Sequence, residues 1–138
     1  MLKAKDIMTA DVVSVKNDAP ISEAISLLIE NNVTGIPVVQ SDLSLVGILT
    51  EKDVLKLVYT KEDVRNKLVC DLMTTPPVHF DENDSLLNVC DCLICNHFRR
   101  VPVTSKGKLV GIISRPDVIR YVSKLKRESN LATPNREK

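Results

Sequence analysis

The chain has 138 residues, of which 43% are hydrophobic and 3% aromatic, and its 19 basic and 18 acidic residues leave a formal net charge of +1. A chain of this length can bury one compact core, which must consist mainly of valine, isoleucine and leucine because aromatic residues are scarce. The near-balance of charge argues against a dedicated nucleic-acid-binding protein. No apolar run reaches the length of a membrane span. We therefore expect neither nucleic acid nor a membrane as a partner.

The first half of the chain alternates short β-branched runs with segments of helical periodicity. From the N-terminus we expect a helical lead-in (3–8), a strand (12–15), a helix (21–30), a strand (36–39), a second strand (45–49) and a closing helix (51–58). Because proline has no N–H to donate, Pro37 should confine its strand to an edge of the sheet or to a strand start. We assign residues 1–60 to a first domain.

The second half repeats this order after a polar linker at residues 61–70. We expect a strand (78–80), a helix (85–95), two strands (101–104 and 109–113) and a last helix (115–125). We assign residues 71–125 to a second domain. The polar tail at 126–138 should be frayed from Arg127 onward.

An internal repeat accounts for this parallel order. Residues 46–54 (VGILTEKDV) recur as 110–118 (VGIISRPDV), and Asp6-Ile7-Met8-Thr9 recurs as Asp71-Leu72-Met73-Thr74. The fold class we expect is α/β (α+β), with two tandem β-α-β-β-α repeats packed about an approximate two-fold axis. Gly47 and Gly111 lie inside strands, where a glycine indicates close approach of another part of the chain.

Each repeat places a hydroxyl residue where a strand turns into a helix, and an aspartate follows three positions later. These pairs are Thr50 with Asp53 and Ser114 with Asp117. The spacing is that of a capping box, so the four residues could serve helix initiation alone. A carboxylate at such a turn is also a good acceptor for two neighbouring hydroxyl groups of a ligand. The spacing alone does not decide between the helix-capping and the ligand-binding interpretation.

The chain resembles a tandem pair of cystathionine β-synthase (CBS) domains, a Bateman module, in stand-alone form. The resemblance covers about residues 1–125. Its motifs are the two Asp-x-Met-Thr heads, the middle segments Gly35-Ile36-Pro37-Val38-Val39 and Arg100-Val101-Pro102-Val103, and the two Val-Gly-Ile stretches with Thr50/Asp53 and Ser114/Asp117. Each motif is weak alone, but all three occur in order, twice.

The resemblance implies a pair of domains with two clefts between them, which in many family members bind AMP, ADP, ATP or S-adenosylmethionine. It implies that the aspartate holds the ribose hydroxyls beside its hydroxyl partner. Residues of the first strand and around the middle proline flank the base, and a basic residue before that proline meets the phosphates. Such modules commonly form homodimers and regulate an effector protein. No cofactor is required beyond the regulatory adenine nucleotide or S-adenosylmethionine.

Carried onto this chain, the resemblance gives the candidate ligand-binding residues Val13, Thr34, Gly35, Ile36, Pro37, Thr50, Asp53, Val78, His79, Arg99, Arg100, Val101, Pro102, Ser114 and Asp117. His79 could equally be a half-exposed surface residue. Arg99 and Arg100 stand where the first repeat has Thr34 and Gly35, and a guanidinium is a good phosphate ligand. We expect a cleft built on Arg99, Arg100, Ser114 and Asp117 to favour a phosphorylated ligand. The cleft built on Thr34, Gly35, Thr50 and Asp53 should take a less charged ligand or none.

The cysteines offer a different kind of site. Cys92 and Cys95 have the Cys-x-x-Cys spacing of metal and redox sites, and Cys90 is close by. No second pair completes a zinc set, and Cys92 aligns with Leu27 of the first repeat. We expect these cysteines to act as small apolar residues on a buried helix face, with no metal bound, while a redox role stays open.

Two other functions compete with ligand sensing. An interaction module would leave the clefts empty and use apolar helix faces for dimerisation or partner docking. An enzyme is not expected, because the sequence shows no phosphate-binding loop, metal-ligand set or nucleophile with an evident base. Residues 1–6 lack the apolar centre of a secretion signal, so we expect a cytoplasmic location with reduced cysteines.

Overall fold

Each repeat folds into a three-stranded sheet with its helices on the outer side. The computed structural model describes residues 1–96 and 98–132. The first sheet contains β1 (Val15–Lys16), β2 (Gly35–Val39) and β3 (Leu45–Thr50), and the second contains β4 (Phe80–Asp81), β5 (Arg100–Ser105) and β6 (Lys108–Ser114). In both sheets the short first strand runs parallel to the middle strand, and the third strand returns antiparallel.

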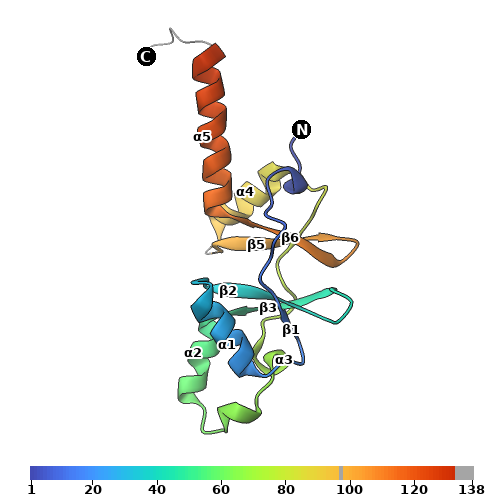
Figure 1. Cartoon of the computed structure of the whole chain (residues 1–138), viewed down its shortest axis with the longest axis vertical. Helices are drawn as coiled ribbons and strands as arrows, with labels where there is room; N and C mark the ends of the chain where they lie inside the picture. The colour runs from blue at the N-terminus through green and yellow to red at the C-terminus, as the bar shows by residue number, and fades with distance from the viewer. Residues whose placement is uncertain (97, 133–138) are drawn as a thin grey trace.

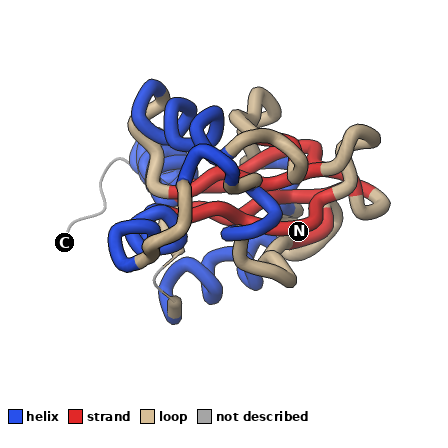
Figure 2. Tube along the Cα trace, turned by 90° about the horizontal axis from the view of Figure 1, so that it is seen from below, coloured by secondary structure: helices blue, strands red, loops and turns tan. Residues whose placement is uncertain are grey.

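The two sheets face each other across the middle of the molecule, and the helices lie at its two ends (Figure 1). The helices are η1 (Ala4–Asp6), α1 (Ile21–Glu30), α2 (Glu51–Leu55), η2 (Lys56–Tyr59), η3 (Val64–Asn66), α3 (Val69–Leu72), α4 (Leu86–Cys95) and α5 (Arg115–Ala132). Seen from below, the strands lie together with helices outside them (Figure 2). Backbone hydrogen bonds from Leu45 to Gly107 and from Leu109 to Leu43 join the two hairpin tips. The expected fold class is confirmed.

The first strand of each repeat is shorter than predicted. β1 begins at Val15 and not at residue 12, and β4 begins at Phe80 and not at residue 78. The apolar residues before each strand look like strand residues in sequence, but they line the clefts described below: Val78 lines the larger cleft and Val13 the smaller one. Val13 is partly buried and Val78 is 43% exposed, so the hydrophobicity of these residues marks a cleft surface and not a place in a sheet.

The last helix is longer than predicted, because α5 continues past Leu125 to Ala132. The expectation of a frayed chain from Arg127 was wrong for residues 127–132, which include neither glycine nor proline and can propagate a helix. Residues 133–138 lie outside the described part of the chain. In the first repeat, by contrast, the closing helix is α-helical only to Leu55 and continues as the 3-10 helix η2.

Pro37 does not place its strand at an edge, because β2 is the middle strand of its sheet. Pro37 pairs with Ile48 of β3, whose own N–H donates to the carbonyl of Thr74 at 3.0 Å. On the other side, β1 pairs only with Val38 and Val39. A middle strand tolerates this proline because its neighbour has not yet begun at that position.

Each repeat has its own core, and each core is completed by the head of the other repeat. Ala4, next to the first Asp-x-Met-Thr motif, is fully buried in the core of the second repeat, among residues such as Val89 and Ile113. Val69, next to the second motif, is fully buried in the core of the first repeat, near Leu49. The two heads are therefore exchanged between the repeats.

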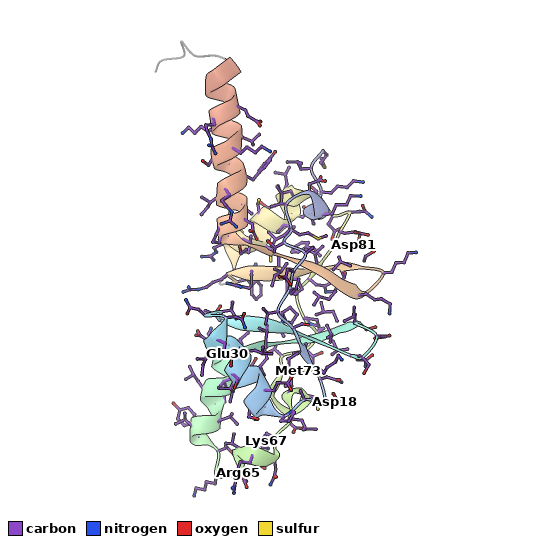
Figure 3. The ribbon with its side chains drawn as sticks, viewed as in Figure 1. Asp18, Glu30, Arg65, Lys67, Met73 and Asp81 are labelled. Atoms are coloured by element: carbon purple, nitrogen blue, oxygen red, sulfur yellow. The ribbon has the colours of Figure 1, made fainter. Side chains whose placement is uncertain are left out.

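The strand glycines make room for this exchange. A Cβ atom at Gly47 would overlap the side chain of Met73, and one at Gly111 would overlap that of Met8. Met73 lies beside the sheet of the first repeat (Figure 3). The close approach that glycine in these strands predicted is thus made by the methionine of each exchanged head.

Candidate functional site

The two turns from strand to helix have nearly the same geometry. The carboxylate of Asp53 accepts from the backbone N–H of Thr50 at 2.9 Å and from its hydroxyl at 3.0 Å. The carboxylate of Asp117 accepts from the same two groups of Ser114, at 2.8 and 2.9 Å. Each aspartate N–H donates back to the hydroxyl, at 3.4 and 3.3 Å. Both turns are therefore capping boxes, as their spacing predicted.

A threonine from the exchanged head completes each turn. The hydroxyl of Thr74 lies 3.0 and 3.2 Å from the two carboxylate oxygens of Asp53, and that of Thr9 lies 3.5 Å from Asp117 Oδ1. These threonines were not among the predicted site residues, although both belong to the repeated head motif. Asp53 and Asp117 are 4% and 9% exposed. Each carboxylate thus lies at a junction of the two repeats.

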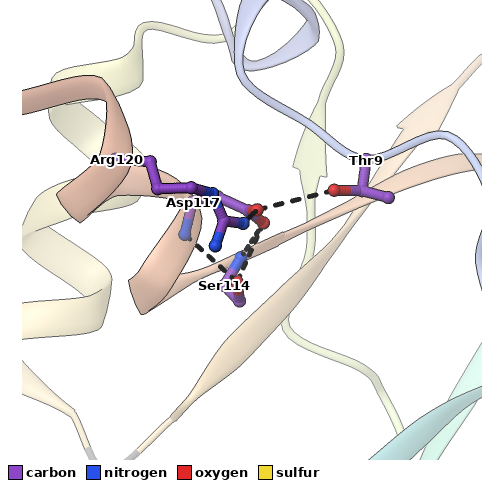
Figure 4. Close-up of polar contacts among 4 residues, drawn as sticks. All are labelled: Thr9, Ser114, Asp117 and Arg120. Atoms are coloured by element: carbon purple, nitrogen blue, oxygen red, sulfur yellow. Dashed lines mark hydrogen bonds and ion pairs between the residues drawn. The ribbon is translucent and has the colours of Figure 1, made fainter. Parts of the chain in front are cut away.

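The second aspartate has a partner of a different kind. The guanidinium of Arg120 forms an ion pair with Asp117 Oδ1 (Figure 4). The Arg120 side chain is 71% exposed, so solvent screens this pair. Lys56 stands at the equivalent position of the first repeat, 64 residues earlier (120 − 64). Asp117 Oδ1 therefore interacts with both Arg120 and, at a longer distance, the hydroxyl of Thr9.

A cleft with a volume of about 490 Å³ opens between the facing sheets. Ten predicted residues line it: Thr34, Gly35, Ile36, Pro37, Thr50, Val78, Arg99, Arg100, Val101 and Pro102. Eight further lining residues were not predicted: Ile48, Glu51, Lys52, Thr74, Pro76, Pro77, Phe98 and Ile112. The prolines, Phe98 and the aliphatic residues give this larger cleft an apolar lining. Among the residues that the structure describes, its charged groups are three cations and one carboxylate.

A smaller cleft, of about 190 Å³, lies beside the second turn. The predicted residues in its lining are Val13, Gly35, Ile36, Arg100, Ser114 and Asp117. Thr9, Asp11, Val12, Val33 and Ile112 complete the lining and were not predicted. One cation and two carboxylates are therefore the charged groups of the smaller cleft.

The structure corrects how the predicted residues are grouped. Arg99 does not lie with Asp117; it lines the larger cleft together with Thr34 and Thr50 of the other repeat. Arg100 lines both clefts. Because the two sheets face each other, residues before the middle proline of one repeat lie opposite the strand-to-helix turn of the other. The larger cleft, which contains both arginines, is therefore built on the strand-to-helix turn of the first repeat.

Two other predicted residues lie away from the cleft surfaces. Asp53 is buried behind Thr50 and Thr74, which both line the larger cleft and both donate to its carboxylate. His79 is exposed, and its Nδ1 lies 3.0 Å from the carbonyl oxygen of Pro77. His79 lies outside both linings, which agrees with the alternative that it is a surface residue.

The cysteine cluster is only partly buried. Cys90 and Cys92 pack against the core of the second repeat, whereas Cys95 is exposed, so the expected buried face does not include it. Burial raises the pKa of the Cys90 and Cys92 thiols, which keeps them protonated and weakly reactive. Within the described residues, no three histidine, cysteine or acidic side chains are grouped closely enough to hold a metal ion. His97, which follows the cluster, lies outside those residues.

The chain belongs to the CBS domain family, because the sequence profile of that family matches residues 4–60 and 69–124. An uncharacterized protein of Methanocaldococcus jannaschii is 35% identical to it over 118 residues, which are 86% of this chain and 42% of that protein. CBSX1, a chloroplastic CBS domain-containing protein of Arabidopsis thaliana, is 33% identical over an alignment 148 residues long, which covers 87% of this chain and 63% of CBSX1. The chain thus spans less than two thirds of these two relatives.

Solved structures show the same architecture. The crystal structure of CBSX2 in complex with AMP superposes with a TM-score of 0.79 at 32% identity, covering 91% of this chain and 99% of the CBSX2 chain in that structure. The CBS domain pair of protein MJ0100 was solved in complex with 5′-methylthioadenosine and S-adenosyl-L-methionine. It superposes with a TM-score of 0.73 at 25% identity, and the match covers 90% of this chain and 98% of the MJ0100 chain in that structure. The predicted tandem CBS pair is therefore confirmed. No helix in the described part of this chain is both long and apolar enough to cross a bilayer.

Proposed function

We propose that the chain is a regulatory module that senses an adenine nucleotide in the larger cleft. The observation that carries this proposal is the meeting of Arg99 and Arg100 with Thr50 in one cleft between the repeats. A guanidinium pair binds phosphate, and hydroxyl and carboxylate groups bind ribose. The complex of CBSX2 with AMP supports the same ligand class.

We assign a part of the proposed ligand to each region of the cleft. The adenine base would pack on Phe98 and the proline-rich wall, because a flat aromatic ring gains from apolar burial and stacking. The ribose hydroxyls would donate to the Asp53 carboxylate, replacing the hydroxyl of Thr74. The phosphate would pair with Arg99 and Arg100 at the opposite wall. Lys52 adds a further positive charge to the lining of the larger cleft, and the Glu51 carboxylate partly offsets it.

Calorimetric titration tests this proposal. AMP, ATP and S-adenosylmethionine are titrated into the folded chain purified free of nucleotide, alongside Arg99→Gln. The matched control is Arg65→Gln, since Arg65 is exposed, pairs with neighbouring Asp63 and lies far from the sheets (Figure 3). AMP binding that Arg99→Gln weakens about tenfold and Arg65→Gln leaves unchanged would support a phosphate site here. Absence of heat with all three ligands would contradict the proposal.

A second candidate function is supported by exposed apolar side chains on the closing helices. Leu55, Val58 and Tyr59 of the first repeat are 61%, 78% and 88% exposed, and Ile119 and Val122 of α5 are 65% and 53% exposed. Such residues favour association. We therefore propose a homodimer formed through these helices, with an effector protein as the alternative partner. Light scattering of the wild type and of Val58→Glu tests it: a wild-type monomer would contradict the homodimer.

The remaining assignments are also proposals. We propose a regulatory role without catalysis, because neither the sequence motifs nor the clefts point to a reaction. A cytoplasmic location is supported by four free cysteines, Cys70, Cys90, Cys92 and Cys95, which favour a reducing compartment. Fluorescence microscopy of the tagged chain tests the location.

A further inference from the structure

The two clefts adjoin, since four residues line both of them: Gly35, Ile36, Arg100 and Ile112. Arg100 is the only charged residue of these four. Its Nε is buried and, within the described part of the chain, has no hydrogen-bond partner. The guanidinium is therefore placed between the clefts without a protein acceptor at this nitrogen.

The other repeat supplies no second cation at this place. The residue equivalent to Arg100, 65 positions earlier (100 − 65), is Gly35, which has no side chain. A Cβ atom at Gly35 would already lie 3.3 Å from the carbonyl oxygen of Leu49. The Arg100 guanidinium is thus the one cation that, among the described residues, lines both clefts.

The other charged groups differ between the clefts. Without Arg100, the larger cleft still has Lys52 and Arg99 against Glu51. Without Arg100, the smaller cleft has Asp11 and Asp117, of which Asp117 is paired with the exposed Arg120. Carboxylates repel phosphate, so the smaller cleft depends on Arg100 for any attraction to a phosphorylated ligand.

We propose that Arg100 couples the two clefts. The chain binds one phosphorylated adenosine derivative tightly, in the larger cleft, and this ligand, by engaging Arg100, excludes phosphate from the smaller cleft. The smaller cleft is left to an adenosine derivative without phosphate. The inference rests on the proposed nucleotide binding in the larger cleft and adds a coupling between sites, which linkage makes reciprocal.

The coupling is measured by titrating AMP or adenosine into the full chain and following the amide resonances of Thr50, for the larger cleft, and Ser114, for the smaller. Asp53→Ala, or Asp53→Asn if the alanine variant does not fold, empties the larger cleft. With the larger cleft empty, the smaller cleft should bind AMP about tenfold more tightly than it does in AMP-saturated wild type. Adenosine affinity at the smaller cleft should differ by less than about threefold between the same two states.

Two arginine variants separate coupling from simple affinity. Arg100→Gln is introduced into the wild type and into Asp53→Ala, and it should abolish the tenfold difference in AMP affinity at the smaller cleft. Arg100→Lys should retain this difference because lysine keeps the positive charge. Arg99→Gln is the matched control: Arg99 lines only the larger cleft, so the difference should persist. Circular dichroism confirms that each variant is folded.

The outcomes are distinguishable. Equal AMP affinity at the smaller cleft in both backgrounds would overturn the coupling while leaving the proposed function intact. Loss of the difference in Arg100→Lys or in Arg99→Gln would overturn the role given to the Arg100 charge. A folded wild-type chain in which neither resonance responds to AMP would overturn both the proposed function and this inference.

Discussion

The larger and smaller clefts come from the same duplicated sequence, yet they differ in volume, charge and the state of their aspartate. Asp53, behind the larger cleft, is fully engaged by Thr50 and Thr74, and three cations face the space in front of it. Asp117, in the smaller cleft, is paired with Arg120 and shares its cleft with a second carboxylate. Residues of both copies line each cleft, so the motif of one copy alone does not define the lining or the charge of either cleft.

The largest effect on AMP affinity is expected from a substitution of Asp53. Asp53→Ala should lower AMP affinity about a hundredfold, or about 2.7 kcal/mol, because the ribose loses its carboxylate acceptor. Asp117→Ala should leave the larger cleft's AMP affinity within about threefold. Calorimetry of both variants measures this, and an equal loss in the two would contradict the assignment of AMP to the larger cleft.

The next effect concerns the cationic wall. Arg99→Gln should weaken AMP binding about tenfold, or about 1.4 kcal/mol, and leave adenosine binding unchanged, because the missing charge faces the phosphate. The measurement is a pair of titrations with the two ligands on the same preparation. If adenosine loses as much affinity as AMP, Arg99 shapes the cleft and does not contact phosphate.

A smaller effect should distinguish the two head threonines. Thr74→Val removes hydrogen bonds of 3.0 and 3.2 Å to Asp53 and should lower the free energy of unfolding by about 1 kcal/mol. Thr9→Val removes only a 3.5 Å contact to Asp117 and should cost about 0.5 kcal/mol or less. Urea denaturation measures both; a larger cost at Thr9 would show that the second turn depends more on its exchanged head.

The smallest effect is expected at Arg120. Arg120→Ala frees an oxygen of Asp117 and should tighten adenosine binding in the smaller cleft about twofold. Stability should change by about 0.5 kcal/mol or less, because the arginine is largely exposed. The Ser114 amide titration reports the affinity, and weaker binding would mean that Arg120 contacts the ligand itself.

Much of the fold could be predicted because the repeat is explicit in the sequence. The helix at 21–30 and the second-repeat hairpin follow from periodicity and turn residues. The short first strands could not be separated from the cleft-lining residues before them, since residues that line a cleft and residues buried in a sheet give the same apolar pattern. The position of Pro37 in a middle strand depends on where β1 begins, which only the three-dimensional pairing fixes.

Many of the residues that line the clefts could be predicted one by one, but their division into two groups could not. Ten of the predicted residues do line the larger cleft, because the family motifs mark them. Their division between clefts depends on how the sheets face each other, and one repeat's sequence does not carry that information. Phe98 and Thr74 could have been found: Phe98 precedes the arginine pair in a chain with few aromatics, and Thr74 is conserved between the two copies.

The exchanged heads also constrain how the protein is made. Ala4 shares its core with residues from Leu86 to Ile113, so a residue that leaves the ribosome early waits for 82 (86 − 4) to 109 (113 − 4) further positions before its packing partners exist. The first repeat is likewise incomplete until Val69 and Met73 have been synthesised. Contacts this distant in sequence slow folding. The first repeat can therefore complete its core once residue 73 has been made, whereas the core of the second repeat, and the clefts with it, form only when both ends of the chain have come together.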